Sequence, residues 1–336
     1  MVHRMRKCVV VCILCCFSAI VAAQPPATYA ERLGFPKGAK VLILHVDDAG
    51  MSFDSNEGAI NAMTKGVANS VSVMMPCPWV PAFVRFLKAH PETDAGLHLT
   101  LTSEWDNYRW GPLQGKPAVP GLVDKEGALW PSVAEVVMHA KPEEVYAEIK
   151  AQLDRARSMG FEPTHLDSHM GTLFASPSFM QVYVKLGVEN KIPVMMPAGH
   201  AKLILEQTKM TPQQADQVRS VGAMLWGAGL PVLDDLHNTS YDWQVPDAVK
   251  NDDKLLQAWK TQQFIAGLKA LQPGVTMMIM HCTAPTEVFP HISDSGPVRK
   301  SDLLAMQDPS FKKALQDEGI ILTTWRELMQ RRQKAQ

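Results

Sequence analysis

The chain has 336 residues, and its composition excludes several classes of protein before any motif is considered. Hydrophobic residues make up 46% of the chain and charged residues 20%, which is typical of a globular protein and not of a disordered one. The 33 lysines and arginines are balanced by 34 aspartates and glutamates, so no excess of positive charge is available to bind nucleic acid. Length alone favours two domains.

The first 23 residues have the pattern of a secretory signal peptide. Arg4, Arg6 and Lys7 precede an apolar run over residues 8–21, and small side chains lead to an expected cleavage after Ala23. We therefore expect a secreted or periplasmic protein, with an uncleaved N-terminal anchor as the alternative. The later sequence contains no second apolar stretch of about 18 residues, so we expect no membrane span in the mature chain.

From Lys40 onward, short apolar runs alternate with amphipathic helical patterns. The expected strands cover residues 40–46, 70–75, 96–102, 164–169, 192–196, 231–237, 275–281 and 320–324. The expected helices cover residues 54–65, 80–89, 142–160, 201–225, 253–271 and 301–317, with another beginning at Pro177 and a charged helical tail at the end. The most clearly delimited helix begins at Pro142, has two glutamates in its first turn and ends at Gly160.

This alternation continues without a linker of shifted composition, so it replaces the two-domain expectation with one α/β domain over residues 24–336. Seven or eight strand–helix units in this length favour an irregular TIM-like (β/α) barrel. An open doubly wound parallel sheet is the alternative, because a sequence does not show whether a barrel closes.

Residues 103–141 interrupt the pattern as a long insertion rich in glycine and proline. They also carry Trp105, Tyr108, Trp110 and Trp130. Insertions of this length are often functional, and we expect this one to influence substrate choice. The alternative is that the aromatic side chains only pack the loop against the domain.

Two adjacent carboxylates, Asp47 and Asp48, follow the first expected strand. Buried carboxylates at the carboxyl end of a strand are costly unless they bind a cation or transfer protons. Neighbouring residues of a strand point in opposite directions, so both can serve one ion only if the chain bends there. A turn with a helix-capping aspartate is the alternative.

Histidines lie at the ends of three further expected strands. His165, Asp167 and His169 share one face of the fourth strand at a period of two, while His98 and His281 belong to the third strand and to a late one. Taken alone, His98 between two leucines is explained as a core histidine. Together with the aspartate pair, these residues predict a divalent-metal centre that activates water, with a carboxylate as base and a histidine as acid.

Three motifs resemble the YdjC-like (ChbG) carbohydrate deacetylase family, within the wider polysaccharide deacetylase group with its irregular (β/α) barrels. They are Val46-Asp-Asp-Ala-Gly50, Gly96-Leu-His-Leu-Thr-Leu-Thr102 and His165-Leu-Asp-Ser-His169. The resemblance extends from about residue 40 to residue 328. It implies removal of acetyl groups from N-acetylated sugars.

The resemblance also implies a role for each matching residue. Asp48, His98 and His169 are the implied metal ligands. Asp47 is the implied base that deprotonates the attacking water, and His281 is the implied acid that protonates the departing amine. A ligand set rich in nitrogen favours zinc, and magnesium is the alternative.

Further residues are implied to support the metal site or to contact the substrate. His165 and Asp167 would orient a ligand histidine or touch the substrate, and the sequence leaves open whether His165 replaces His169 as a ligand. Trp105 and Trp110 are expected to contact the substrate.

Departures from the family pattern leave the substrate open. Met170 follows the third motif where the family usually has further histidines, Ala49 replaces an aromatic residue, and Cys282 follows the last histidine. The partner is therefore an acetylated carbohydrate or another acylated small molecule. One alternative is an amidase or esterase that acts on a non-sugar substrate through the same centre. Another is a non-catalytic glycan-binding barrel whose Trp105, Trp110 and Trp130 stack on sugars.

Two cysteines, Cys77 and Cys282, remain after the expected cleavage. An exported protein permits a disulfide between them, and two free buried thiols are the alternative.

Overall fold

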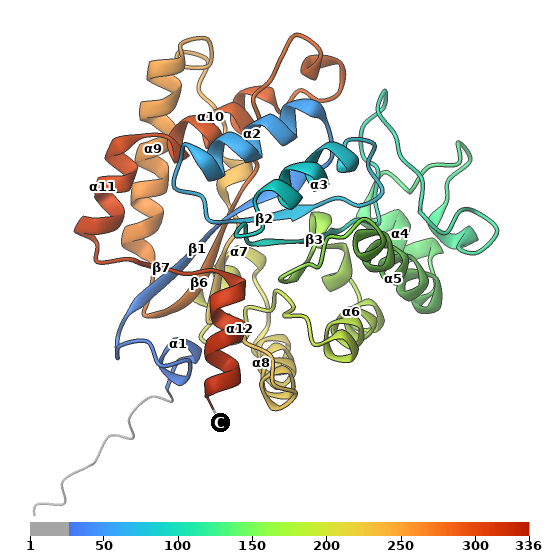
Figure 1. The fold of residues 1–336 in the computed structure, drawn as a ribbon, viewed down its shortest axis with the longest axis horizontal. Helices are drawn as coiled ribbons and strands as arrows, with labels where there is room; N and C mark the ends of the chain where they lie inside the picture. Colours follow the sequence, from blue (N-terminus) through green and yellow to red (C-terminus); the bar gives the residue numbers. More distant parts are fainter. Residues whose placement is uncertain (1–26, 336) are drawn as a thin grey trace, which may run out of the picture.

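A computed structural model of the chain describes residues 27–335 (Figure 1). Its centre is a parallel sheet of seven strands, in which six follow the order β4-β3-β2-β1-β6-β5 and β7 pairs with β1. The expected signal peptide, with its cleavage after Ala23, lies outside the described residues. Within residues 27–335, no helix is both long enough and apolar enough to cross a membrane.

The strands lie close to where the sequence predicts them, although several are short. They are β1 (Lys40–Ala49), β2 (Ser70–Val73), β3 (Ala95–Leu99), β4 (Leu166–Ser168), β5 (Asp235–His237), β6 (Gly274–Met280) and β7 (Ile321–Leu322). β1 is the central strand, because β2 pairs with it on one side and β6 on the other. Both β1 and β6 are buried almost throughout, which explains their nearly continuous apolar sequences.

Twelve α-helices surround the sheet in the described part of the chain. They are α1 (Tyr29–Arg32), α2 (Phe53–Thr64), α3 (Val80–Ala89), α4 (Val133–His139), α5 (Pro142–Ser158), α6 (Pro177–Asn190), α7 (Lys202–Thr208), α8 (Pro212–Gly227), α9 (Asp253–Ala270), α10 (Gly296–Met306), α11 (Pro309–Asp317) and α12 (Trp325–Lys334). Figure 1 shows α9, α10 and α11 along one flank of the sheet and α4, α5 and α6 along the other.

The α/β class and the parallel sheet are confirmed, but a full barrel of seven or eight units is not. The sheet forms a half-barrel. Val194, in the expected fifth strand 192–196, makes an isolated bridge with Leu166, and Pro197, directly after it, makes one with Leu233. Neither Pro193 nor Pro197 has an N–H to donate, so they limit ladder formation.

Two expected helices are each divided in two by a proline. The helix predicted over 201–225 is α7 and α8, because Thr211 caps a new helix that begins at the following proline. The helix predicted over 301–317 is α10 and α11, because Asp308 caps a helix that begins at Pro309. The sequence signals for these caps are present, but the continuous apolar pattern obscured them.

The core forms two apolar clusters on opposite faces of β1. Leu42 and Leu44 belong to the cluster packed against surrounding helices such as α2, α3 and α9. Val41 and Ile43 belong to the other, which includes residues of β5, β6 and α12. At a period of two, His45 continues the face of Val41 and Ile43, so β1 carries polar side chains on that face towards its end.

The inserted segment 103–141 contains little regular structure before α4. Trp130 donates its indole N–H to the carbonyl of Gly121 at 2.8 Å and stacks on the ring of His139 at 4.3 Å between centroids. Trp130 therefore secures the segment internally, as the loop-packing alternative predicts for this residue.

Candidate functional site

The end of β1 bends at the two adjacent carboxylates. Asp48 has a left-handed backbone conformation with φ 68°, and the register with β2 shifts between Val46 and Ala49. Aspartate tolerates this conformation better than most residues. The bend that Asp47 and Asp48 need in order to serve one site is therefore present.

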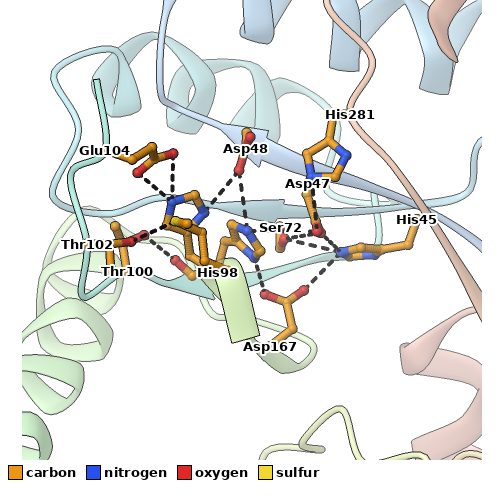
Figure 2. A network of polar contacts seen from close by, with 12 residues as sticks. His45, Asp47, Asp48, Ser72, His98, Thr100, Thr102, Glu104, Asp167 and His281 are labelled. Atoms are coloured by element: carbon orange, nitrogen blue, oxygen red, sulfur yellow. Dashed lines mark hydrogen bonds and ion pairs between the residues drawn. The ribbon is translucent and has the colours of Figure 1, made fainter. Parts of the chain in front are cut away.

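Asp48, His98 and His169 meet at this bend, and all three side chains are buried. Oδ1 of Asp48 lies 3.3 Å from Nε2 of His98 and 3.4 Å from Nδ1 of His169. Figure 2 shows the side chains of Asp48 and His98 directed at each other. Among the described residues, this Oδ1 has no hydrogen-bond partner of good geometry. A buried carboxylate oxygen of this kind, faced by two imidazole nitrogens, fits a divalent cation.

Each of these two histidines contacts a carboxylate through its other ring nitrogen. Nδ1 of His98 lies 2.6 Å from Oδ1 of Asp167, which leaves Nε2 directed at Asp48. Nε2 of His169 lies 3.1 Å from Oε2 of Glu104, which leaves Nδ1 directed at Asp48. Carboxylates in this position commonly orient metal-binding histidines. A metal ion would therefore bind Nε2 of His98 and Nδ1 of His169.

The electrostatics of this group also suit a cation. Burial opposes the charge on Asp48, but Arg299, with Nη1 2.7 Å from Oδ2, and the two histidines hold the pKa of Asp48 well below its usual range. Burial disfavours protonation of His169, yet Glu104 and Asp48 raise its pKa to about 9. The nearby carboxylates likewise raise the pKa of His98 despite its burial. The concentration of negative charge attracts protons or a metal ion, which compete for the same nitrogens.

Asp47 lies beside this group with one oxygen tethered and the other facing the centre (Figure 2). Its Oδ1 accepts a hydrogen bond from Ser72 at 3.2 Å and lies 3.1 Å from Nε2 of His45. Its Oδ2 lies 3.8 Å from Nε2 of His98 and 3.8 Å from Nε2 of His281. Burial lowers the pKa of His281, so that its ring is neutral at neutral pH.

A second group, His45, His165 and Asp167, lies beneath the first. Its atoms are also close enough to hold a metal, with Oδ2 of Asp167 2.9 Å from His45 and 3.7 Å from His165. None of the three is among the described residues that line the cleft above. The structure therefore brings His169, and not His165, to Asp48, and leaves Asp167 as the residue that orients His98.

His165 is instead part of the packed interior. Its ring is fully buried and stacks on Trp325 at 5.2 Å between centroids. A side chain at Gly96 would come within 2.5 Å of this ring, so the glycine of the second motif makes room for it. The expected substrate contact by His165 is therefore not what the geometry shows.

The group of Asp48, His98 and His169, which could hold a metal ion, opens into a cleft of about 770 Å³. Asp47, Asp48, His98, His169 and His281 all line it.

The expected aromatic contacts are divided between the cleft and the core. Trp105 lines the cleft, but Trp110 is only 5% exposed, is not among the described lining residues, and donates its indole N–H to the carbonyl of Thr102 at 2.9 Å. The rings of Trp105 and Trp110 contact each other at 5.6 Å between centroids. Trp110 therefore supports Trp105 from behind.

Four residues near the site were not predicted from the sequence: Glu104, Arg299, and the buried ion pair of Lys260 and Asp302 beside His281. Glu104 follows the second motif closely, and its position beside that motif was an available signal. Arg299 is 251 residues from Asp48 in the chain, and nothing in the local sequence indicates the contact.

The pair that holds His281 is fully buried. Asp302 accepts a hydrogen bond from the backbone N–H of His281 at 2.8 Å and lies 2.9 Å from the ammonium of Lys260. Cys77 and Cys282 are both free and buried, so the structure contains no disulfide between them.

Comparisons with known proteins agree with this geometry. The sequence matches the family described as YdjC-like protein over residues 41–317. A carbohydrate deacetylase from Thermus thermophilus is 31% identical over 297 residues, which cover 88% of this chain and 96% of that protein. A second carbohydrate deacetylase, from Thermoanaerobacter pseudethanolicus, is 23% identical over 286 residues, or 85% of this chain and 98% of that protein.

The fold is also similar to a solved structure. A protein from Enterococcus faecalis named for cellobiose-phosphate cleavage superposes with a TM-score of 0.68 at 20% identity, covering 86% of this chain and 99% of that one. The family match spans the bend at Asp48 and the strand end at His281. The chain therefore belongs to the YdjC-like family.

Proposed function

We propose that the chain is a metal-dependent hydrolase that removes acetyl groups from N-acetylated carbohydrates. The observation that carries this proposal is the unpartnered Oδ1 of Asp48, faced by two carboxylate-oriented histidines and flanked by a second carboxylate. Full-length similarity to proteins named carbohydrate deacetylases supports the substrate class.

The proposed ligands are Asp48, His98 and His169, and their nitrogen-rich set favours zinc over magnesium. A divalent ion held there would supply a Lewis acid that polarises the acyl carbonyl and acidifies water. Asp47 then acts as the general base. Because Ser72 and His45 hold Oδ1 of Asp47, its Oδ2 is free to accept the proton of the attacking water.

His281 completes the proton balance in this proposal. Its Nε2 faces Oδ2 of Asp47 at 3.8 Å, and its ring is neutral in the resting state because burial lowers its pKa. A small shift lets the ring receive the proton that Asp47 takes from water and donate it to the departing amine. The water oxygen bonds to the acyl carbon as the C–N bond breaks, and the second proton of the water also ends on the amine, so that the products are acetate and the protonated amine of the sugar.

Acetate release by the purified protein tests the proposal. We expect release from N-acetylated chitooligosaccharides, loss of activity with a chelator, and recovery when zinc or magnesium is added back, with the more effective ion identifying the metal. Activity that survives both the chelator and Asp47→Asn would reject the mechanism. Glycan binding without turnover, retained in metal-free Asp47→Asn protein, would support the glycan-binding alternative.

We also propose that residues 1–23 direct export. The basic segment, the short apolar run and the small side chains before the cleavage position support this proposal. Mass spectrometry of protein recovered from cells that express the full chain should show an N-terminus at Gln24. A protein that retains Met1 but is exported would support the uncleaved anchor, and recovery of the chain from the cytoplasm alone would overturn the proposal.

A further inference from the structure

The cleft continues beyond the group of Asp48, His98 and His169 as an apolar wall. We use this name for six cleft-lining side chains from α6, α7, β5, β6 and the irregular segments after β4: Phe174, Met180, Met195, Leu205, Leu236 and Ile279. The wall residues are buried or half-buried, so the wall forms the floor of the cleft and not an exposed surface.

Outside the charged group, most polar side chains of the same cleft lie at its exposed rim, whereas Ser168 is buried and Gln207 is half-buried. Gln214, Arg219, Asn238 and Asp242 all line the cleft and are all exposed. The wall offers no side-chain hydrogen-bond donor or acceptor apart from the weak thioether sulfurs. A sugar hydroxyl buried against it would lose its bonds to water without replacement, which is unfavourable. The floor therefore suits a hydrocarbon group, and the rim suits polar groups next to it.

The wall joins the catalytic group on the side of the departing amine. Ile279 lies on β6, His281 directly follows the last residue of that strand, and both side chains line the cleft. In the proposed mechanism His281 protonates the amine that carries the sugar. A group attached to the sugar therefore extends along β6 and β5 towards Leu236, while the acetyl methyl group stays at the metal.

We propose that the apolar wall binds a hydrocarbon aglycone, so that the substrate class is an N-acetylated sugar linked to an apolar chain or ring system. This inference rests on the proposed deacetylase function and names its substrate class. Two of the six side chains are methionines, Met180 and Met195, whose flexible thioethers adapt to an apolar surface of irregular shape.

Two glycosides that differ only in the aglycone test this inference. We expect kcat/KM for acetate release from octyl N-acetyl-β-glucosaminide, below its micelle concentration, to exceed that for the methyl glycoside at least tenfold. The reason is that several methylene groups leave water on the wall. This comparison uses the unaltered chain, so it does not depend on a variant folding. Equal values for the two glycosides would overturn the inference.

Variants locate the effect on the wall. Leu205→Gln and Met180→Gln should each lower the octyl-to-methyl ratio of kcat/KM at least threefold. Met224→Gln is the matched control, because Met224 is an exposed methionine of α8 that is not among the described cleft residues. An equal fall of the ratio in the control would contradict the assignment to the wall.

Calorimetry separates failure of this inference from failure of the proposed function. Asp47→Asn protein should bind the octyl glycoside at least tenfold more tightly than the methyl glycoside. If that holds while the unaltered protein releases no acetate, the wall is supported and the deacetylase function is wrong. If both glycosides are deacetylated equally, the function is supported and the wall assignment is wrong. A preference for N-octanoylglucosamine over N-acetylglucosamine would mean that the wall holds the acyl chain, which overturns the inference.

Discussion

The two halves of the cleft are built on opposite principles. In the charged half, at the ends of β1, β3 and β4, the carboxylates of Asp47 and Asp48 each lie beside at least one buried histidine or arginine. In the other half, the floor is apolar and comes from α6, α7, β5, β6 and the irregular segment between β4 and β5. In the mechanism and the substrate class that we propose, the charged half would determine which bond is broken, and the apolar half would determine which molecules bind with that bond at the centre.

The largest effect should come from separating the base from the metal ligands. Asp47→Asn should lower kcat by about 10²- to 10⁴-fold, because the amide cannot accept the proton of water. Metal content, measured by atomic absorption, should not change, since Asp48, His98 and His169 remain. Loss of the metal in Asp47→Asn would show that Asp47 is itself a metal ligand. The roles of general base and metal ligand would then not belong to different residues.

The next largest effect is expected for the buried ion pair of Lys260 and Asp302, which holds the backbone of His281. Lys260→Met leaves Asp302 buried without its cation and should lower the free energy of unfolding by about 3–5 kcal/mol in urea titrations. Lys300→Met is the control, because its partner Asp253 is exposed, and it should cost less than about 1 kcal/mol. Equal losses in the two variants would show that the buried pair contributes no more than a surface pair.

Glu104 connects the inserted segment to the charged half. Glu104→Gln should weaken metal binding about 10- to 100-fold, because His169 loses the carboxylate that orients it. Competition with a zinc-binding dye measures this affinity without any turnover. Glu126→Gln, an exposed glutamate in the same segment, should bind metal as the unaltered chain does. Identical metal affinities in the two variants would show that Glu104 does not contribute to metal binding.

The smallest effect on kcat/KM is expected for Trp105, whose ring lines the cleft. Trp105→Ala should lower kcat/KM by about two- to tenfold, because an aromatic ring that lines the cleft is lost. Trp130→Phe should not alter kcat/KM, since Trp130 contacts Gly121 and His139 within the inserted segment. A larger effect for Trp130 than for Trp105 would show that Trp130, and not Trp105, contacts the substrate.

The sequence predicted those parts of the fold in which a local pattern persists for many residues. β1, α2, α3 and α5 lie within a few residues of their expected positions, because their sequence patterns persist and because α3 and α5 have a proline in the first turn. Residues 192–196 failed as a strand because apolar content does not reveal that Pro193 and Pro197 withhold backbone donors. Barrel closure depends on such segments, and it was the least predictable property of the fold.

In the candidate site, residues within local motifs could be predicted from the sequence, whereas residues that reach the site only through tertiary contacts could not. Asp48, His98 and His169 were grouped as candidate ligands because each belongs to a recognisable motif, and the structure places them together. Arg299 was not, because its contact with Asp48 exists only after α10 has packed beside the sheet. Trp110 was assigned to the substrate because an aromatic side chain that packs behind a site and one that lines it look alike in a sequence.

The left-handed backbone at Asp48 determines which substitutions at this position leave the local structure intact. Alanine is strained in that conformation by about 1–2 kcal/mol, whereas asparagine adopts it readily. An alanine substitution would therefore perturb the bend that directs Asp47 as well as removing the Asp48 carboxylate. Asp48→Asn removes the charge, and with it the ion pair with Arg299, but keeps the bend, so it tests the carboxylate separately from the backbone. The backbone angle at Asp48 therefore determines which substitution at this position can be interpreted.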